Sequence, residues 1–456
     1  TWQNAEKIYD SAKDEVGKLG TIINQAQALQ TLGLYRRAQT LLEQVSQSLQ
    51  SQPDSLIKAT GLRSLGIALQ VAGNLDRSKE VLQHSLAISQ KLGSDAATSA
   101  TLLSLGNTAR AQQDLNAAIQ FYRQAVTKAT HPLDQTEALL SQFSAHLEQK
   151  QGEEATELLP QIKEAIASLP PSRMSIYAQV NFAQSLVKMG QESKREVSNY
   201  QLPTTHYQDT AQLLAKAVQQ AKQLNDKRAE SYAIGELGKV YQLTGQLTEA
   251  QGLTEQALLI ANGIEADEIA YRWQAQLGEI LNVRGDNKGA IAAYTNAVKT
   301  LNTIRRDLVA MNPEVQFSFR ESVEPVYREL VSLLLEPPLN KEGQEKIAPE
   351  QKNIKQALEV IEGLQLAELD NFFRQACLDV KPQQIDQVDA KAAVIYPLIL
   401  KDRIEVILSL PNQPALNYKT YLPKEEIERK LKQLRGSLSL SAANSEHLNL
   451  YATLYN

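Results

Sequence analysis

A repeated pattern of small residues constrains this chain of 456 residues more than any other feature. Each copy holds a small residue, usually after a leucine, then an apolar residue three positions later, glycine seven later, and small or β-branched residues twelve and nineteen later. The copies start at Ala26, Gly66, Gly106, Gly238 and Gly278, and the first three starts are forty residues apart, as are the last two. A constant register of this kind predicts a solenoid rather than separate domains.

Each position of the pattern has a physical role. Small residues let two helices approach closely, the loop glycine ends the first helix in a left-handed conformation, and leucines at three- and four-residue spacing bury the shared face. In the copy at Gly106, Gln113 replaces the loop glycine. We therefore expect two helices per copy, each about sixteen residues and ~24 Å long. An irregular bundle of amphipathic helices would leave the register unexplained.

Weaker copies lie between the strong ones. One is centred on Ala145 with Gly152, and one on Ala183 with Leu186 and Gly190. The polar stretch 191–209 is expected to be a loop inserted into the array. The predicted fold class is mainly α, with a right-handed α-α superhelix of about seven helix pairs over residues 1–301.

The register resembles that of the tetratricopeptide repeat family, roughly from Ile8 to Leu301, with a period longer than the usual thirty-four residues. The resemblance implies a concave groove, lined by the first helix of each pair, that recognises a protein or peptide. Residues one, four and five positions after each start, and Arg63 three before its start, are expected to project into this groove. The candidate peptide-binding residues are Gln27, Gln30, Arg63, Gln70, Asn107, Arg110, Lys239, Gln242 and Asn282.

These groove residues are polar and rich in amides, which suits hydrogen bonding to the backbone of an extended peptide. Asn107, Arg110 and Arg63 together offer donors for an acidic group. The alternative is that they are solvated positions on an exposed helix face.

Composition narrows the partners and the chemistry. The 47 basic and 52 acidic residues are interspersed and give a net charge of −5, which argues against nucleic acid as a partner. We find no apolar run long enough to span a membrane. The single cysteine, Cys377, excludes an internal disulfide, and the scattered histidines give no metal-ligand spacing. No cofactor motif is present. The chain starts at Thr1, so a removed leader remains an alternative to the default cytoplasmic location.

The repeat register stops after Leu301. Residues 302–378 are expected to form linker helices, with one break at Asn312-Pro313 and a proline-rich loop from Glu336 to Pro349. Residues 379–456 then change character: 392–400, 404–410 and 417–422 are predicted strands, and 424–437 a charged helix. Pro397 within the first strand argues for an edge or bulge position.

Three segments of this region, in order, resemble another family. They are FRESVEPVYRELVSLLL from Phe319, ALEVIEGLQLAELDNFFRQACL from Ala357, and AVIYPLILKDRIEVILSLP from Ala393. They are similar to the junction and opening strands of the CHAT family, caspase-like domains found behind tetratricopeptide arrays, most abundantly in cyanobacteria. The resemblance implies catalysis by a His and Cys dyad on later strands, and those motifs are absent. Cys377 and His447 occur in the reverse order, and Cys377 lies on a predicted helix.

We therefore expect an incomplete CHAT-like domain and no catalytic residue in this chain. The first functional hypothesis is a scaffold whose groove recognises a protein or peptide, as the regulatory or substrate-recognition part of a CHAT-family protein. The alternatives are a fragment of a caspase-like cysteine endopeptidase whose dyad lies beyond this chain, and a purely structural scaffold. Unpaired strand edges near Val394 and Val406 predict self-association through the C-terminal segment.

Overall fold

The fold is described from a computed structural model, which covers residues 2–31, 35–50, 52–196, 205–304, 322–336, 349–373, 392–411 and 413–439. A short helix, α1 (Trp2–Ser11), precedes seven antiparallel helix pairs. The pairs are α2 (Glu15–Thr31) with α3 (Tyr35–Gln50), α4 (Leu56–Val71) with α5 (Leu75–Lys91), α6 (Asp95–Ala111) with α7 (Leu115–Lys128), α8 (Pro132–Glu148) with α9 (Gly152–Ser168), α10 (Arg173–Glu196) with α11 (Thr205–Gln223), α12 (Lys227–Leu243) with α13 (Leu247–Gly263), and α14 (Asp267–Val283) with α15 (Asn287–Ile304).

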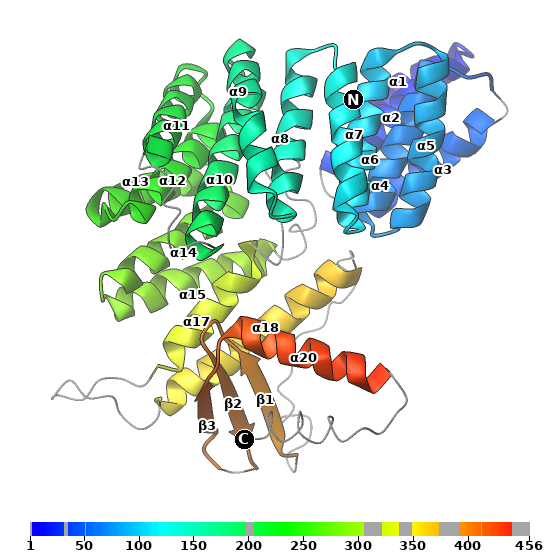
Figure 1. The fold of residues 1–456 in the computed structure, drawn as a ribbon. Coiled ribbons are helices and arrows are strands. Elements are labelled where there is room, and N and C mark those ends of the chain that lie inside the picture. Colours follow the sequence, from blue (N-terminus) through cyan, green and yellow to red (C-terminus); the bar gives the residue numbers. More distant parts are fainter. Residues whose placement is uncertain are drawn as a thin grey trace.

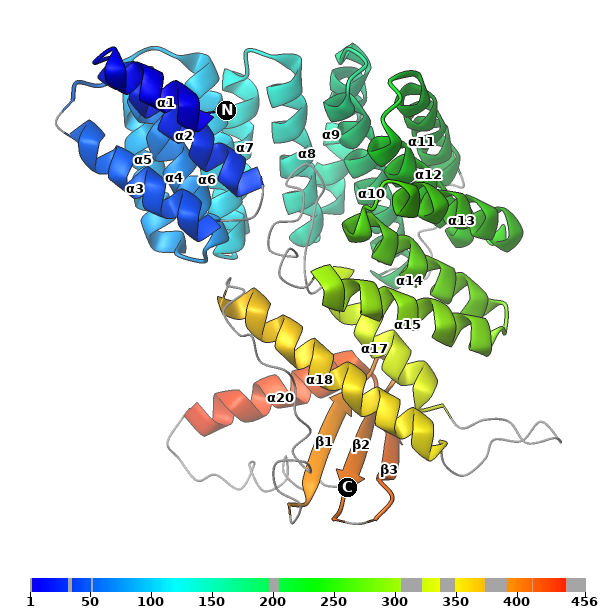
Figure 2. The same cartoon turned by 180° about the vertical axis from the view of Figure 1, so that it is seen from behind.

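The pairs follow one another in a curved row, from α1–α7 at one end to α14 and α15 at the other (Figures 1 and 2). The first helices of adjacent pairs contact one another along the row, whereas the second helices approach each other less closely. In a curved stack the elements on the inside lie closer together, so the first helices form the inner face. This arrangement confirms the predicted fold class.

The turn has the predicted geometry in the strong copies from Gly66 onward, whereas Gly33 of the first copy lies outside the described residues. Gly73, Gly245 and Gly285 have φ values of 82°, 81° and 81°. Gln113 takes the same left-handed conformation, with φ of 65°, although it carries a side chain. The backbone hydrogen bonds around the turn therefore hold this conformation even where glycine is missing.

The structure corrects the weaker copies. The left-handed residue after α8 is Lys150, with φ of 61°, and Gly152 begins α9 instead. The fourth copy therefore starts at Phe143, seven residues before Lys150, and not at Ala145. Gly190 lies inside α10 and makes no turn. The stretch 191–209, predicted as a loop, is helical over 191–196 and again from Thr205, while 197–204 lie outside the described residues.

The small residue that starts each strong copy lies against the second helix of its own pair. A Cβ atom added to Gly106 would lie 2.4 Å from Tyr122 Cε1, and one added to Gly278 would lie 2.6 Å from Tyr294 Cδ2. Gly66 has the same relation to Leu82, at 2.5 Å from Cγ. In each case the contacting residue follows the glycine by sixteen positions, so one rule sets the packing of three pairs.

We predict that Gly106→Ala lowers the free energy of unfolding. Alanine gains ~1 kcal/mol of helix propensity, but overpacking against the buried Tyr122 ring costs about 1–3 kcal/mol. Gly252→Ala in α13 is the matched control, because nothing lies within 4 Å of its added Cβ, and it should stabilise the chain. Urea unfolding followed by circular dichroism measures both. Equal stabilisation by the two changes would contradict the packing rule.

The C-terminal part packs below the last pair. It contains α17 (Glu324–Leu334), α18 (Gln351–Phe373), the strands β1 (Val394–Ile399), β2 (Arg403–Ser409) and β3 (Leu416–Tyr421), and α20 (Lys424–Ser439). The strands form an antiparallel sheet in the order β1-β2-β3, with Ile399 opposite Ile404 and Leu408 opposite Leu416. β1 is an edge strand, which confirms the position predicted from Pro397. Cys377 and His447 lie outside the described residues.

One apolar core joins the last helix pair to the sheet. Tyr271 and Leu301 belong to the same buried cluster as Tyr327 of α17 and Leu398 and Ile407 of the sheet. Two arginines reinforce this contact. Arg328 Nη1 donates to Ile399 O at 2.9 Å, and Arg403 Nη2 donates to Ser332 O at 3.0 Å.

A buried ion pair of β2 lies on the face of the sheet that packs against this core. Arg403 Nε is 2.6 Å from Glu405 Oε1, and Asn417 Nδ2 donates to Glu405 Oε2 at 2.8 Å. The Glu405 side chain is fully buried, so its charge depends on these two partners.

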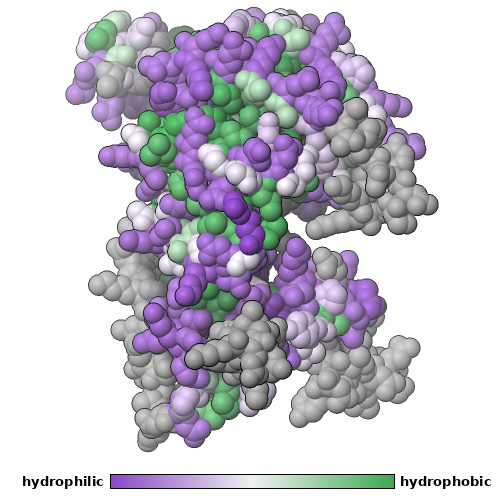
Figure 3. Space-filling view, turned by 90° about the vertical axis from the view of Figure 1, so that its left-hand side faces the viewer, coloured by the Kyte–Doolittle hydropathy of each residue, from purple (hydrophilic) through white to green (hydrophobic). Residues whose placement is uncertain are grey.

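The surface is mostly hydrophilic. Seen from the left-hand side of Figure 1, a band of hydrophobic side chains runs between hydrophilic ones (Figure 3). Large exposed apolar residues include Leu259 of α13 and Val283 of α14, and Ile395, Leu416 and Tyr418 on one face of the sheet. Among the described helices, none is long and apolar enough to cross a bilayer.

Candidate functional site: the inner face of the array

The first helix of each pair keeps one stripe partly accessible. In α4 the half-buried positions include Thr60, Arg63, Ile67 and Gln70. In α6 they include Ala100, Leu103, Asn107 and Arg110. Spacings of three and four residues place each set on one helix face. Polar groups and aliphatic side chains therefore alternate along the inner face.

Two predicted groove cations are already bound to carboxylates of the next pair. Arg110 of α6 makes a two-pronged ion pair with Glu148 of α8, with Nε 3.0 Å from Oε2. Lys239 Nζ of α12 lies 2.6 Å from Glu279 Oε2 of α14, and it also contacts Gln242 Oε1 at 3.4 Å. These contacts tie neighbouring first helices together, so a ligand would have to compete for them.

Two predicted amides also have partners inside the array. Asn107 Oδ1 accepts a hydrogen bond from Tyr122 OH at 2.8 Å, within one helix pair. Gln27 Nε2 donates to Ser64 Oγ at 3.0 Å, between the first two pairs. Three residues were predicted to hold an acidic group, namely Asn107, Arg110 and Arg63. Because Asn107 and Arg110 already have partners within the array, Arg63 is the one that is left.

The remaining predicted residues differ in what they offer. Gln70 is half-buried and Asn282 is exposed. The side chain of Gln30 is not among those that the structure describes. The Nε atom of Arg63 is buried without a hydrogen-bond acceptor. Burial lowers the pKa of Arg63, and the charge of Asp134 acts in the opposite direction.

Arg272 of α14 is a groove residue that the sequence reasoning missed. Its guanidinium lies 5.9 Å from the centroid of the Tyr232 ring and 5.7 Å from that of Tyr271. The Nε atom is buried without an acceptor, and so is the hydroxyl of the fully buried Tyr271. The Tyr271 hydroxyl and the Glu236 carboxyl act on the rest of the guanidinium, so Nε is the atom that lacks an acceptor.

Glu236 of α12 is the carboxyl group that acts electrostatically on Arg272. It accepts a hydrogen bond from Gln184 Nε2 of α10 at 2.7 Å. Burial raises the pKa of Glu236, although the Gln184 hydrogen bond and the charges of Arg272 and Lys239 act to lower it. Three successive first helices thus contribute to one polar cluster.

The repeat register contains a signal that could have identified Arg272. Arg272 lies six positions before its start, Gly278, and Tyr232 lies six before Gly238. Both therefore occupy the same register position on neighbouring first helices. The prediction uses only positions one, four and five after the start and position three before it, so it does not include this row.

Comparisons with known proteins agree with this architecture. Residues 58–130, which span α4 to α7, match a family model described as tetratricopeptide repeat. Residues 58–130 of the array are therefore tetratricopeptide repeats. No curated protein matches the chain. In the described residues, no group of three or more His, Cys, Asp or Glu side chains is placed to hold a metal ion.

Several solved structures are similar in part to this tetratricopeptide array. BtubC from P. vanneervenii is 15% identical, with 54% of this chain and 96% of that chain covered and a TM-score of 0.42. A Rap protein complexed with competence and sporulation factor is 15% identical, covering 78% and 99% with a TM-score of 0.41. Aspartyl phosphate phosphatase F from Bacillus subtilis is 12% identical, covering 80% and 97% with a TM-score of 0.39. All three TM-scores are below 0.5, so no feature of this chain is inferred from them.

We predict that Glu236→Gln makes the chain more stable at pH 7. The folded-state pKa of Glu236 is raised, so the folded state binds its proton more tightly than the unfolded state does. The stability that Glu236 contributes is therefore present below its ordinary pKa of 4.5. It is lost as the pH rises through the pKa of Glu236 in the folded state. Glutamine still accepts the bond from Gln184 and carries no charge.

Urea unfolding of both proteins at pH 7, 5.5 and 4 measures the difference. The advantage of the variant should shrink toward pH 4, where Glu236 becomes protonated in both states. A variant that is less stable than the native chain at pH 7 would show that attraction to Arg272 outweighs the cost of burial.

Proposed function

We propose that the inner face of the array recognises a protein or peptide and that Arg272 is an anchor for an acidic group on it. The buried Nε–H donor of Arg272, which has no acceptor among the described residues, carries this proposal. A buried donor without an acceptor is costly, typically by about 1–3 kcal/mol. A ligand carboxylate would supply the missing acceptor through charge-assisted hydrogen bonds.

The surroundings of Arg272 support this assignment. The Tyr232 and Tyr271 rings lie beside the guanidinium and orient it. Arg63 of α4 offers a similar guanidinium in the first half of the array. The half-buried Ile67 and Leu103 provide apolar contacts between them. An extended segment with an acidic group and aliphatic side chains matches this surface.

Binding of the full chain to a peptide array tests this function. We expect acidic peptides to bind, and Arg272→Gln to weaken them about tenfold or more, as the loss of a hydrogen bond to a charged group implies. Arg284→Gln is the control, because Arg284 Nη1 hydrogen-bonds Gln251 of the second helix α13. Binding that survives Arg272→Gln unchanged would contradict the proposal, provided circular dichroism shows that the variant is folded.

We further propose that the C-terminal segment is the opening part of a CHAT-like domain and that the array selects its target. The observed strands β1, β2 and β3 lie within two residues, at each end, of the strands predicted from the residue pattern, and β1 and β2 fall in the segment from Ala393 that carries the resemblance. The division into residues 1–301, 302–378 and 379–456 belongs to this proposal. In the alternative, the chain is the recognition fragment of a caspase-like cysteine endopeptidase.

The coding sequence downstream of Asn456 tests the second proposal. A strand followed by His and a later strand followed by Cys would support a peptidase. A continuation without either motif would leave a recognition scaffold as the function of the chain.

Self-association through the C-terminal segment is also part of the proposal. The sheet has two edge strands, and Ile395, Leu416 and Tyr418 are exposed on one face. We expect light scattering after size-exclusion chromatography to show dimers at high concentration, and Tyr418→Lys to reduce them. A monomer at every concentration would contradict this expectation.

A further inference from the structure

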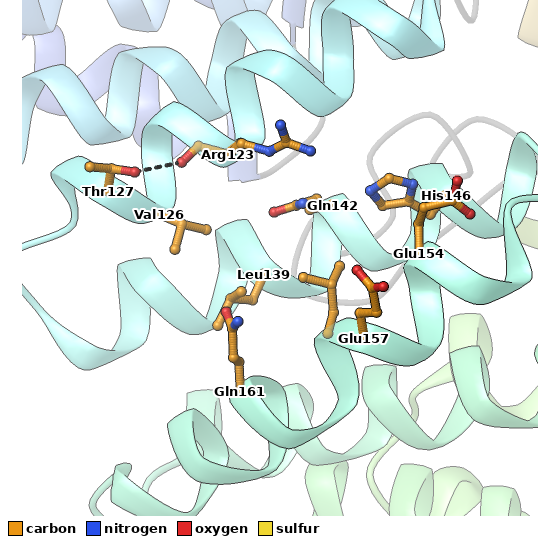
Figure 4. A pocket seen from close by; sticks show the side chains of 10 residues that line it. Arg123, Val126, Thr127, Leu139, Gln142, His146, Glu154, Glu157 and Gln161 are labelled. Atoms are coloured by element: carbon orange, nitrogen blue, oxygen red, sulfur yellow. Dashed lines mark hydrogen bonds between the residues drawn. The ribbon is translucent and has the colours of Figure 1, made fainter.

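A pocket of about 350 Å³ opens between α7, α8 and α9, away from the inner face. Its lining includes Gln142 and His146 of α8, Glu154 and Glu157 of α9, and Arg123 of α7. Figure 4 shows these side chains pointing from three helices toward a common space. The proposed function makes no use of this pocket.

The internal register explains why a pocket forms here. With Phe143 as the start of the fourth copy, Gln142 lies one position before the start and His146 three after it. The same two positions hold Leu65 and Leu69, Leu105 and Ala109, Leu237 and Tyr241, and Leu277 and Leu281 in the strong copies from Gly66 onward. In those four copies apolar or aromatic side chains occupy both positions, whereas the fourth copy replaces both with polar side chains.

The two replacements form a polar floor. Gln142 and His146 are each only 5% exposed. The Gln142 amide has no hydrogen-bond partner among the described residues. His146 Nδ1 is 2.7 Å from Gln151 Oε1. With that oxygen accepting, Nδ1 carries the proton and Nε2 is left as a hydrogen-bond acceptor. Both side chains line the pocket, so these polar groups are available to a ligand.

The charged groups at the rim indicate what that ligand is. Glu154, Glu157 and Arg123 are exposed, and none of them has an ion-pair partner in the described part of the chain. Two carboxylates against one guanidinium favour a cation. Leu139 and Leu158 add apolar walls that suit a methylene stem.

We propose that this pocket binds the guanidinium or ammonium end of a basic side chain in a partner protein. The carboxylates of Glu154 and Glu157 neutralise the charge. Gln142 Oε1 and His146 Nε2 accept N–H hydrogen bonds at the floor, and the leucine walls contact the stem. The site is separate from the inner face. A partner that touches both would be held by one of its acidic groups at Arg272 and by one of its basic groups in this pocket.

Isothermal titration calorimetry of the full chain with short blocked peptides tests the proposal. Gly-Arg-Gly is the probe, and Gly-citrulline-Gly is its neutral isostere. We expect the arginine peptide to bind measurably more tightly. Equal binding of the two peptides would show that the charge is not recognised. Tighter binding of free L-arginine than of the blocked peptide would identify a small-molecule site and overturn the partner side chain as ligand.

Variants locate the binding site. Gln142→Leu with His146→Leu restores the apolar pair of the strong copies, and it should abolish binding while raising the melting temperature. Glu154→Gln with Glu157→Gln should weaken the arginine peptide about tenfold, as expected for two exposed ion pairs. Glu153→Gln is the matched control, because this exposed neighbour does not line the pocket.

Two results would overturn the assignment. One is retained binding in the leucine double variant, and the other is an equal loss in Glu153→Gln, which would mean a general surface effect. Arg272→Gln should leave the arginine peptide bound, because the two sites are on different helices. A failure at one site is therefore distinguishable from a failure at the other.

Discussion

The close approach of two helices at a single small residue is the constraint on which the rest of the array depends. At Gly66, Gly106 and Gly278 the second helix places a large side chain where a Cβ atom would be. This contact fixes the two helices of a pair relative to each other. Once pairs have the same geometry, they can stack only in a curved row, and the first helices necessarily form its inner face. The accessible stripe, for which we propose a role in recognition, is thus a consequence of packing between helices.

Electrostatics then divides the inner face into groups that hold the array together and groups that remain available. Arg110 and Lys239 lie opposite carboxylates of the following first helix, so their charges are neutralised within the protein. Arg272 lies beside two aromatic rings and feels the charge of Glu236, but it forms no salt bridge with a carboxylate among the described residues. A cation over an aromatic face is stabilised without using its N–H donors, and those donors are what a ligand needs. Basic residues therefore have two roles on this surface. Arg110 and Lys239 join neighbouring helices, and Arg272 is the one proposed to bind a ligand.

Sequence reasoning predicted the parts of the fold that follow from local pattern. The strong copies, the left-handed turns, the three strands and the edge position of Pro397 all have short-range signals. The start of the fourth copy was misplaced because Lys150 adopts the left-handed conformation without being glycine, so the glycine two residues later was taken for the turn. The pairing of Arg110 with Glu148 was missed for another reason. It joins residues 38 apart, and only the stacked geometry brings them together.

The continuous core at the end of the array gives the inner face a physical connection to the sheet. Tyr271, whose ring contacts Arg272, is buried in the same cluster as Leu398 and Ile407. Arg403 links the sheet to α17 through Ser332 and is held in place by the buried Glu405. Close-packed interiors transmit displacement rather than absorb it. Tyr271 therefore connects Arg272 of the inner face to the core that supports the sheet.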